Sequence, residues 1–314
     1  MLSLEFTNEA PIDWNNFFLD NGLGIFSQSL EYSNYVSKWV GWEPLFCRVI
    51  DEKGKILLQN LVFKYNPGIS RIPNFAKSIY KKLKKSYRWS YGPISIHDDA
   101  TSKFFKNFEK NGDSFYGTTH PFLPISIKNS TKWATSIIDL HQTKEEIQKK
   151  FDKNSCKKNI KRSIERGVTI EPINEKNFHE YSSIRNDFRN KTSDTLHQSE
   201  ELSGFWNSLQ PIGFAGFLAK KNDIPIGGLT FSYFNKYLIE VGVARSKLDF
   251  EEKLYSQDLI KWKIIEWGIE NNMDYFDLAG YDPVPKSEKE IGIMRYKEKW
   301  GGKRYDYWIV KNGN

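Results

Sequence analysis

Apolar and polar residues alternate over short distances in the first half of the chain, which predicts strands and helices in turn. We expect strands at residues 2–6, 44–50 and 55–64 and one ending near 91–93, and helices at 14–20, 30–40, 76–85 and 100–110. The strands 44–50 and 55–64 should form a hairpin, because Gly54 between them can take the positive φ of a tight loop. The proline-containing segment 120–124 resists regular structure, so a domain boundary is expected near residues 118–135.

In the second half the pattern predicts the order β-α-α-β-β-β-α-β-α-β. Thr143 and Glu146 have capping-box spacing and should start a helix, and Gly167 should end it. Within that helix Cys156, Ile160 and Ile164 recur every four residues and should form one buried face. Strands are expected at 168–172, 212–220, 225–234, 236–245, 274–278 and 304–310, and helices at 175–190, 199–209, 254–271 and 290–300. The helix 254–271 is apolar on several faces and should lie sandwiched in a core.

The length of 314 residues favours two domains, which we expect at 1–135 and 136–314. The 22 Phe, 16 Tyr and 10 Trp provide enough apolar surface for a globular core in each. The N-terminus lacks the pattern of a secretory leader and no run is long enough to span a membrane, so a cytoplasmic location is expected. Two distant cysteines predict reduced thiols and no disulfide framework.

The net charge of +7 and the pI near 9.0 favour anionic partners. Much of the positive charge falls between residues 149 and 166. This stretch is a surface for nucleic acid or an anionic headgroup, or a solvated helix face, or a linker helix that joins two domains.

Four segments together resemble a known family. They are CKKNIKRSIERGV at 156–168, PIGGL at 225–229, FDLAG at 276–280 and GIMRYKEKWGG at 292–302. These segments and the element order resemble the GNAT acyltransferase fold, and in particular the FemA/FemB/FemX group of aminoacyltransferases. The resemblance spans most of the chain. It implies an α/β fold with mixed sheets, built from two GNAT-like domains of which the N-terminal one is degenerate.

The resemblance implies transfer of an amino acid from aminoacyl-tRNA onto an amine of a cell-envelope precursor, and related proteins use acyl-CoA as the donor. A CoA-binding member normally carries a glycine-rich loop that cradles the pyrophosphate. The corresponding stretch here, residues 244–254, has no glycine and several acidic side chains, which disfavours CoA. We therefore expect no resident cofactor, with aminoacyl-tRNA as the donor and Lys158, Lys161 and Arg162 as its phosphate contacts.

Attack of an amine on an ester or thioester builds negative charge on oxygen, which a nearby cation stabilises. The resemblance implies this role for the aromatic-Lys pair of the family's last helix, which falls here on Tyr296 and Lys297. Lys297 is the candidate oxyanion stabiliser; Tyr296 either adds a hydrogen bond or packs. Asp277 either holds the incoming ammonium or accepts its proton, or it caps the turn at Gly280.

Further substrate-binding candidates are Gly227 and Gly228, which permit a bulge and close approach of a substrate or a tight sheet contact, and Tyr91. Tyr91 lies in residues 89–98, where lipid-linked peptidoglycan enzymes of this family carry a Pro-Arg-Gly-Pro loop. The arginine is missing here, so the acceptor is less defined than the reaction class.

Other chemistries have little support. The five histidines show no metal-binding spacing and no cysteine partner, so no metal is expected, and neither a Gly-x-Ser-x-Gly elbow nor a Walker loop occurs. Two alternatives stay open beside aminoacyl transfer. One is an acyl-CoA-dependent N-acetyltransferase; the other is a non-catalytic double-GNAT module that binds RNA or anionic headgroups, with peripheral membrane contact.

Overall fold

The computed structural model describes residues 1–65, 86–110, 113–123, 125–128, 130–192, 206–207, 211 and 213–312. Its internal contacts divide the chain into unit 1, residues 1–134 with 305–314, and unit 2, residues 135–304. The final residues therefore group with unit 1, whereas the expected second domain ran to the C-terminus. The predicted helices at 76–85 and, for the most part, 199–209 lie outside the described residues.

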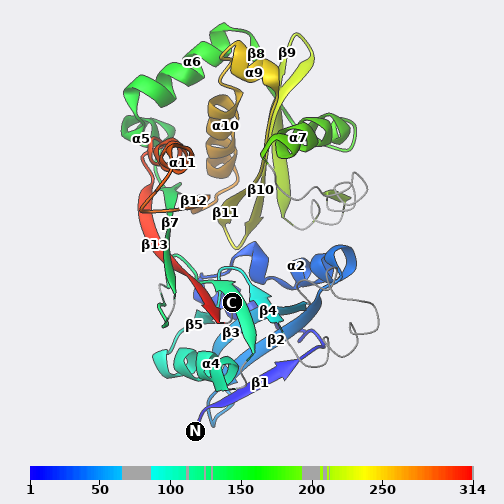
Figure 1. Ribbon diagram of the computed structural model, residues 1–314, viewed down its shortest axis with the longest axis vertical. Helices are drawn as coiled ribbons and strands as arrows, with labels where there is room; N and C mark the ends of the chain where they lie inside the picture. Colours follow the sequence, from blue (N-terminus) through cyan, green and yellow to red (C-terminus); the bar gives the residue numbers. More distant parts are fainter. Residues whose placement is uncertain are drawn as a thin grey trace. The chain divides into compact units, whose positions relative to one another are not determined.

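Unit 1 is a mixed sheet with helices packed on it (Figure 1). Its elements are β1 (Ser3–Thr7), α1 (Asn16–Asn21), η1 (Phe26–Gln28), α2 (Leu30–Tyr35), η2 (Val36–Val40), β2 (Glu43–Ile50), β3 (Ile56–Tyr65), β4 (Ser86–Trp89), β5 (Ile94–Ser95), α4 (Asp98–Lys110) and β6 (Ser114–Thr118). The predicted hairpin is confirmed, because β2 and β3 pair antiparallel. Its core is aromatic: Trp89 stacks on Phe115 with ring centroids 5.4 Å apart, and α4 contributes Phe104 and Phe108.

Two long strands, β7 (Thr131–Asp139) and β13 (Lys303–Asn312), have residues in both units. Unit 2 also contains α5 (Lys144–Lys150), η4 (Lys153–Lys157), α6 (Lys158–Glu165), β8 (Val168–Pro172), α7 (Phe178–Thr192), β9 (Phe214–Lys221), β10 (Ile224–Phe234), β11 (Tyr237–Arg245), α9 (Lys247–Glu251), α10 (Ser256–Glu270), β12 (Tyr275–Tyr281) and α11 (Glu288–Glu298). The strands β8 to β11 are antiparallel, and β12 joins β11 in parallel. The predicted mixed α/β class is confirmed.

The helix α10 forms the centre of the unit 2 core, as its apolar pattern predicted. Ile260, Ile264 and Ile265 are completely buried, and the helix packs on β9 and β10. Successive glycines on β10 show how the sheet is covered on both sides. A Cβ added to Gly227 would collide with Ser256 of α10, and one added to Gly228 would collide with Tyr181 of α7. Because neighbouring strand residues point to opposite faces, α10 and α7 cover opposite faces of this sheet.

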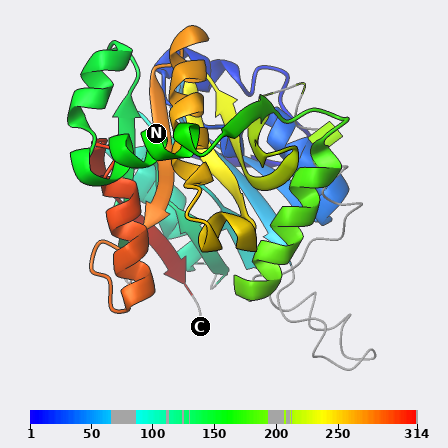
Figure 2. The same ribbon diagram turned by 90° about the horizontal axis from the view of Figure 1, so that it is seen from above.

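The basic stretch after Thr143 is not one helix, which corrects the prediction. The capping box of Thr143 and Glu146 is present, but α5 ends at Lys150. Phe151 then takes an extended backbone and buries its ring 5.1 Å from that of Trp300, and the Asp152 side chain caps the next turn. In both views α5 lies beside α11 (Figures 1 and 2).

The predicted buried face of this stretch is also wrong in part. Cys156 is buried and Ile160 packs against the core, but Ile164 is 58% exposed. Ser163, three residues after Ile160, takes the buried position instead. Gly167 ends the helix with a φ of 72°, as expected.

Candidate active site

Lys297 lies near the C-terminal end of α11, a helix that starts with a capping box of Ser287 and Glu290. Its Nζ donates to the carbonyl oxygens of Ala279 at 3.0 Å and Gly280 at 2.9 Å. An ammonium has three N–H groups, so one is left over from these two bonds. Burial lowers the pKa of Lys297, and the nearby Glu240 opposes this shift. The two carbonyl contacts hold the Lys297 ammonium at the end of β12 and leave its third N–H group pointing away from that strand.

Asp277 organises the chain that holds Lys297. Its buried carboxylate accepts from the backbone N–H of Ala279 at 2.7 Å and from the hydroxyl of Tyr237 at 2.7 Å, and Thr135 also donates to it. Ala279 has a φ of 61°, which turns the strand here. Burial raises the pKa of Asp277, and these hydrogen bonds oppose the rise. The contacts agree with the turn-stabilising role, one of the two roles that the sequence left open.

Tyr296 lies between two buried ion pairs. Lys261 of α10 pairs with Glu240 of β11, and Lys299 pairs with Asp258 of α10. The Nζ atoms of Lys261 and Lys299 lie 5.2 and 4.3 Å from the centroid of the Tyr296 ring. Burial raises the pKa of Tyr296 well above its ordinary value, so its hydroxyl stays protonated. The Tyr296 ring packs between the two cations, and this contact fixes the rotation of α11 about its axis. The next residue, Lys297, is then turned toward β12.

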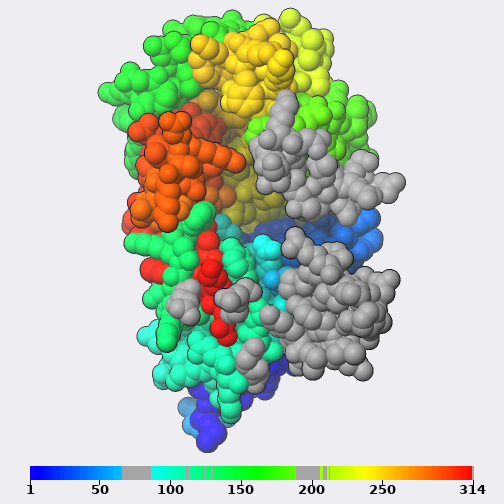
Figure 3. Space-filling view, viewed as in Figure 1, coloured from blue at the N-terminus to red at the C-terminus, as the bar shows by residue number. Residues whose placement is uncertain are grey.

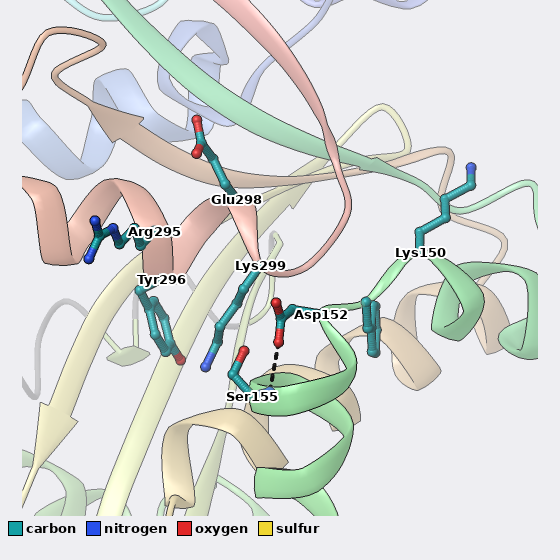
Figure 4. Close-up of a pocket in the computed structure, with 8 residues that line it drawn as sticks. Lys150, Asp152, Ser155, Arg295, Tyr296, Glu298 and Lys299 are labelled. Carbon is teal, nitrogen blue, oxygen red and sulfur yellow. Dashed lines mark hydrogen bonds between the residues drawn. The ribbon is translucent and has the colours of Figure 1, made fainter.

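A pocket of about 620 Å³ opens between the end of α5 and α11. It is lined by Lys150, Phe151, Asp152, Ser155, Arg295, Tyr296, Glu298 and Lys299. Figure 4 shows Tyr296 and Lys299 turned toward Ser155, and Arg295 and Glu298 turned away. Lys297 is not part of this lining. The pocket and the carbonyl-bound lysine are therefore separate features of the same helix.

A buried ion pair lies where the pairing of β11 with β12 ends. The two strands pair in parallel from Tyr237 opposite Tyr275 to Ile239 opposite Asp277, and within the described residues their pairing ends there. Glu240 is the next residue of β11, and its ion pair with Lys261 is almost completely buried, with Lys261 1% exposed. An internal ion pair thus occupies the place where the sheet opens.

A second internal carboxylate occupies the N-terminus of α10. Within residues 244–254, which lack glycine, Lys247–Glu251 form the short helix α9, capped by Ser246. Asp249 of α9 is completely buried, pairs with Arg245 and accepts from the backbone N–H of Ser256 at 2.9 Å. A carboxylate at a helix N-terminus satisfies the same N–H groups and dipole that would bind a phosphate. In Figure 3 the α9 segment (gold) lies at the surface of unit 2.

The two glycines of β10 have close internal neighbours. A Cβ on Gly228 would lie 2.5 Å from Cδ2 of Tyr181, and one on Gly227 would overlap the Ser256 hydroxyl. The pairing of β10 with β9 shifts between Pro225 and Gly227, so the bulge that the sequence allowed is present. The contacts agree with the tight-packing interpretation of both positions.

The basic candidates lie on α6, which Figure 1 shows near α9 and not beside α11. Lys158 and Lys161 are exposed, and Lys161 pairs with Glu165 at 3.6 Å. The guanidinium carbon of Arg162 lies 5.9 Å from the centroid of the Tyr255 ring. The structure does not group these residues with Lys297 on one element.

Tyr91 belongs to unit 1 and is a separate candidate. Its φ is 53°, its backbone N–H donates to the Thr118 hydroxyl at 2.9 Å, and its ring lies 5.8 Å from that of Tyr307. Its ring is held against β13, and its backbone is held against β6.

Sequence reasoning missed the buried ionic residues Glu240, Asp249, Asp258 and Lys261. The last two carried a signal, since they are charges within the otherwise apolar pattern of residues 254–271. Within the described ranges no cluster of three or more His, Cys, Asp or Glu could hold a metal ion. None of the described helices is long and apolar enough to cross a membrane.

No protein-family model and no curated protein matches the sequence. Solved structures do match. FemX aligns with a TM-score of 0.69 at 10% identity, over 98% of this chain and 97% of that chain. The C-terminal domain of a putative lysylphosphatidylglycerol synthetase from Agrobacterium fabrum aligns with a TM-score of 0.56 at 11% identity, over 95% and 93%. A tandem GNAT protein of the clavulanic acid pathway aligns with a TM-score of 0.54 at 10% identity, over 99% of both chains.

These likenesses define the class of fold. The chain has the double GNAT fold that FemX has, and the predicted fold of two GNAT-like domains is confirmed. At 10 to 12% identity they show the fold and leave the chemistry to the site.

Proposed function

We propose that this protein is an N-acyltransferase that moves an aminoacyl group from aminoacyl-tRNA to an amine. The observation that carries the proposal is the Lys297 ammonium, held by the Ala279 and Gly280 carbonyls with one N–H group free. The double GNAT fold supports it, because neighbours with this fold include FemX and a putative lysylphosphatidylglycerol synthetase, a name that joins an amino acid to a lipid.

In the proposed reaction the amine nitrogen attacks the carbonyl carbon of the aminoacyl ester. Negative charge builds on the carbonyl oxygen, and the free N–H of Lys297 donates to it. The tetrahedral intermediate then collapses: the C–O bond to the ribose breaks, and the ribose hydroxyl leaves with the proton that the amine gives up. The two backbone carbonyls fix the direction of the ammonium, so little reorganisation is needed during the reaction.

The choice of donor rests on Asp249. A CoA pyrophosphate would need the N–H groups at the start of α10, and an internal carboxylate already accepts from Ser256 there. A bound pyrophosphate would also face the negative charge of Asp249. Aminoacyl-tRNA needs no such loop, and the exposed Lys158 and Lys161 and the half-buried Arg162 of α6 can contact its phosphates.

The acceptor in this proposal is an amine of a cell-envelope precursor, by analogy with FemX, and the reaction takes place in the cytoplasm, where aminoacyl-tRNA is made. The analogy concerns the fold, so the acceptor is the part that most needs an experiment.

The test offers the purified protein aminoacyl-tRNA and acyl-CoA mixtures in parallel, each with a panel of primary amines, and detects transfer by mass. We expect products from aminoacyl-tRNA only. Products from acyl-CoA alone would show that the N-terminus of α10 can release Asp249 and would make the protein a CoA-dependent N-acetyltransferase. Absence of any product over a broad panel, with salt-sensitive tRNA binding, would favour the non-catalytic module.

A further inference from the structure

The helix α7 contains a buried arginine without an acceptor. Arg185 is 9% exposed, and its Nε has no hydrogen-bond partner. Over the parts of the chain that the structure describes, no carboxylate pairs with it. Glu180 on the same helix is already paired with Lys220 at 2.8 Å, and Asp187 is exposed. A buried N–H without an acceptor destabilises a fold, so a role for the Arg185 Nε–H must be sought elsewhere.

Two further polar groups lie on the same side of α7. Ser182 lies three residues before Arg185 and four before Asn186. Residues at these spacings are neighbours on a helix, so Ser182 lies next to both. The Ser182 hydroxyl and the Asn186 Oδ1 are also buried without a hydrogen-bond partner. A hydroxyl and a carboxamide can each donate, since the amide can rotate to present Nδ2. Two unused donors, the Arg185 Nε–H and the Ser182 hydroxyl, thus lie on neighbouring positions of α7, beside an Asn186 amide that becomes a third donor only when it is rotated.

Below Arg185 the sheet has a glycine, Gly242, and the Tyr181 and Thr230 hydroxyls fill the space where its Cβ would lie. Tyr181 donates to the Gly242 carbonyl at 3.1 Å, and a Cβ added to Gly242 would lie 3.5 Å from the Arg185 Nε. The pairing of β10 with β11 shifts beside Thr230, so β11 bulges next to Gly242. Arg185 therefore lies over a glycine at an irregular point of β11.

Gly242 of β11 and Gly280 of β12 both lie just beyond the paired part of these two strands. The parallel pairing ends at Ile239 with Asp277, and Gly242 and Gly280 each follow three residues later. The Gly280 carbonyl accepts from Lys297 at 2.9 Å. Arg185 lies on the α7 face of β11, whereas α11, which carries Lys297, contacts Lys261 of α10 through Tyr296, and α10 covers the opposite face.

We propose that Arg185, Ser182 and Asn186 form an oxyanion-binding subsite for a carboxylate or phosphate group of the amine acceptor. A guanidinium matches both anions with two parallel hydrogen bonds. The assignment to the acceptor rests on the proposed function: if Lys297 contacts the donor carbonyl from one face, the second reactant approaches from the other. The acceptor is then an amine that carries its anionic group close to the reacting nitrogen.

The test measures binding without any transfer reaction. The probes are O-phosphoethanolamine, glycine and ethanolamine, which present an amine with a phosphate, with a carboxylate and with neither. Calorimetry gives their dissociation constants, and the Arg185 Nε–H signal in a ¹H–¹⁵N spectrum, assigned by its loss in Arg185→Met, reports the site. We expect phosphoethanolamine or glycine to bind and shift that signal, and ethanolamine to do neither. Of the two anionic probes, the one that binds more tightly shows whether the subsite prefers a phosphate or a carboxylate.

Arg185→Met should weaken binding of the better probe at least tenfold, and Arg185→Lys less, since a charge-assisted hydrogen bond is lost or weakened. Arg166→Met, which removes an exposed arginine of the same unit, should leave binding unchanged. Unliganded Arg185→Met should be as stable as the wild type or more so, because it removes an unpaired charge. A stability loss without any probe binding would show that Arg185 serves the fold and would overturn the subsite.

The two proposals fail separately. Lys297→Met should bind the probe as tightly as the wild type does, because Lys297 is not part of the subsite. If the wild-type protein binds the probe but transfers no acyl group, only the proposed function is contradicted. A protein that transfers to anionic amines, with the same KM in Arg185→Met as in the wild type, contradicts the subsite only. An unshifted Arg185 signal with both anionic probes would also overturn the subsite.

Discussion

The carboxylate of Asp249 accepts a hydrogen bond of 2.9 Å from the backbone N–H of Ser256. The α9 segment thus supplies, from within the chain, the negative charge that the N-terminus of α10 favours. This contact gives a structural reason for the missing glycine-rich loop at residues 244–254. In place of a loop open to a phosphate, the chain has a buried acid and its partner Arg245.

Asp249→Ala should destabilise unit 2. The substitution removes the cap of α10 and leaves Arg245 without its buried partner, so we expect a loss of about 3 kcal/mol in the free energy of unfolding. Urea denaturation followed by circular dichroism measures it. Glu251→Ala, which removes the exposed partner of Lys247 on the same short helix, is the control and should change little. Equal stability of the two variants would contradict the capping role.

Gly228→Ala should lower stability through overpacking. The added Cβ would lie 2.5 Å from the Tyr181 ring, and that ring is 1% exposed and hydrogen-bonded, so it has little room to move. We expect a loss of about 1 to 3 kcal/mol. Gly292→Ala on α11 is the matched control: nothing lies within 4 Å of its Cβ, and alanine should stabilise that helix by about 0.5 to 1 kcal/mol. A stable Gly228→Ala variant with impaired acceptor binding would instead favour the substrate-contact interpretation.

The fold was predictable from sequence wherever the pattern was local. The β2–β3 hairpin, the capping box at Thr143 and the apolar helix α10 each depend on residues close together in the chain. The break after Lys150 was missed because it depends on the burial of Phe151 against Trp300, which is distant in sequence.

The candidate site was predictable only in part for the same reason. The family motif pointed to Lys297, but its carbonyl partners come from β12, and no spacing rule connects the two. The ion pair of Lys261 with Glu240 and the unpaired Arg185 depend likewise on which side chains the fold brings inside.

Asp277→Asn separates positioning from base catalysis. Because the Asp277 carboxylate holds the Ala279 N–H, we expect the amide to loosen the carbonyls around Lys297 and lower kcat by roughly tenfold. The acid limb of the pH–rate profile should stay where it is, since the acceptor amine sets it. Disappearance of that limb would assign Asp277 as the general base. Asp274→Asn, on a partly exposed acid just before β12, is the control.

The pH–rate profile should also have an alkaline limb that belongs to Lys297. Burial lowers the pKa of this lysine below its ordinary 10.5, and only the protonated form can stabilise an oxyanion. Activity is therefore present below that lowered pKa and is lost as the pH rises through it. Lys297→Arg keeps its charge at every accessible pH. Its pH–rate profile should therefore have no alkaline limb, even if its transfer rate is lower than that of the wild type. An alkaline limb at the same pH in both proteins would assign it to another group.

The most direct test of the account compares wild type with Lys297→Met in single-turnover transfer from aminoacyl-tRNA, with tRNA affinity measured on the same preparations. We predict a fall of at least about a hundredfold in the transfer rate, as for loss of an oxyanion donor, with tRNA affinity unchanged. An unchanged transfer rate would contradict the role of Lys297. Absence of transfer by the wild type, with tRNA still bound, would contradict the assignment of an aminoacyltransferase.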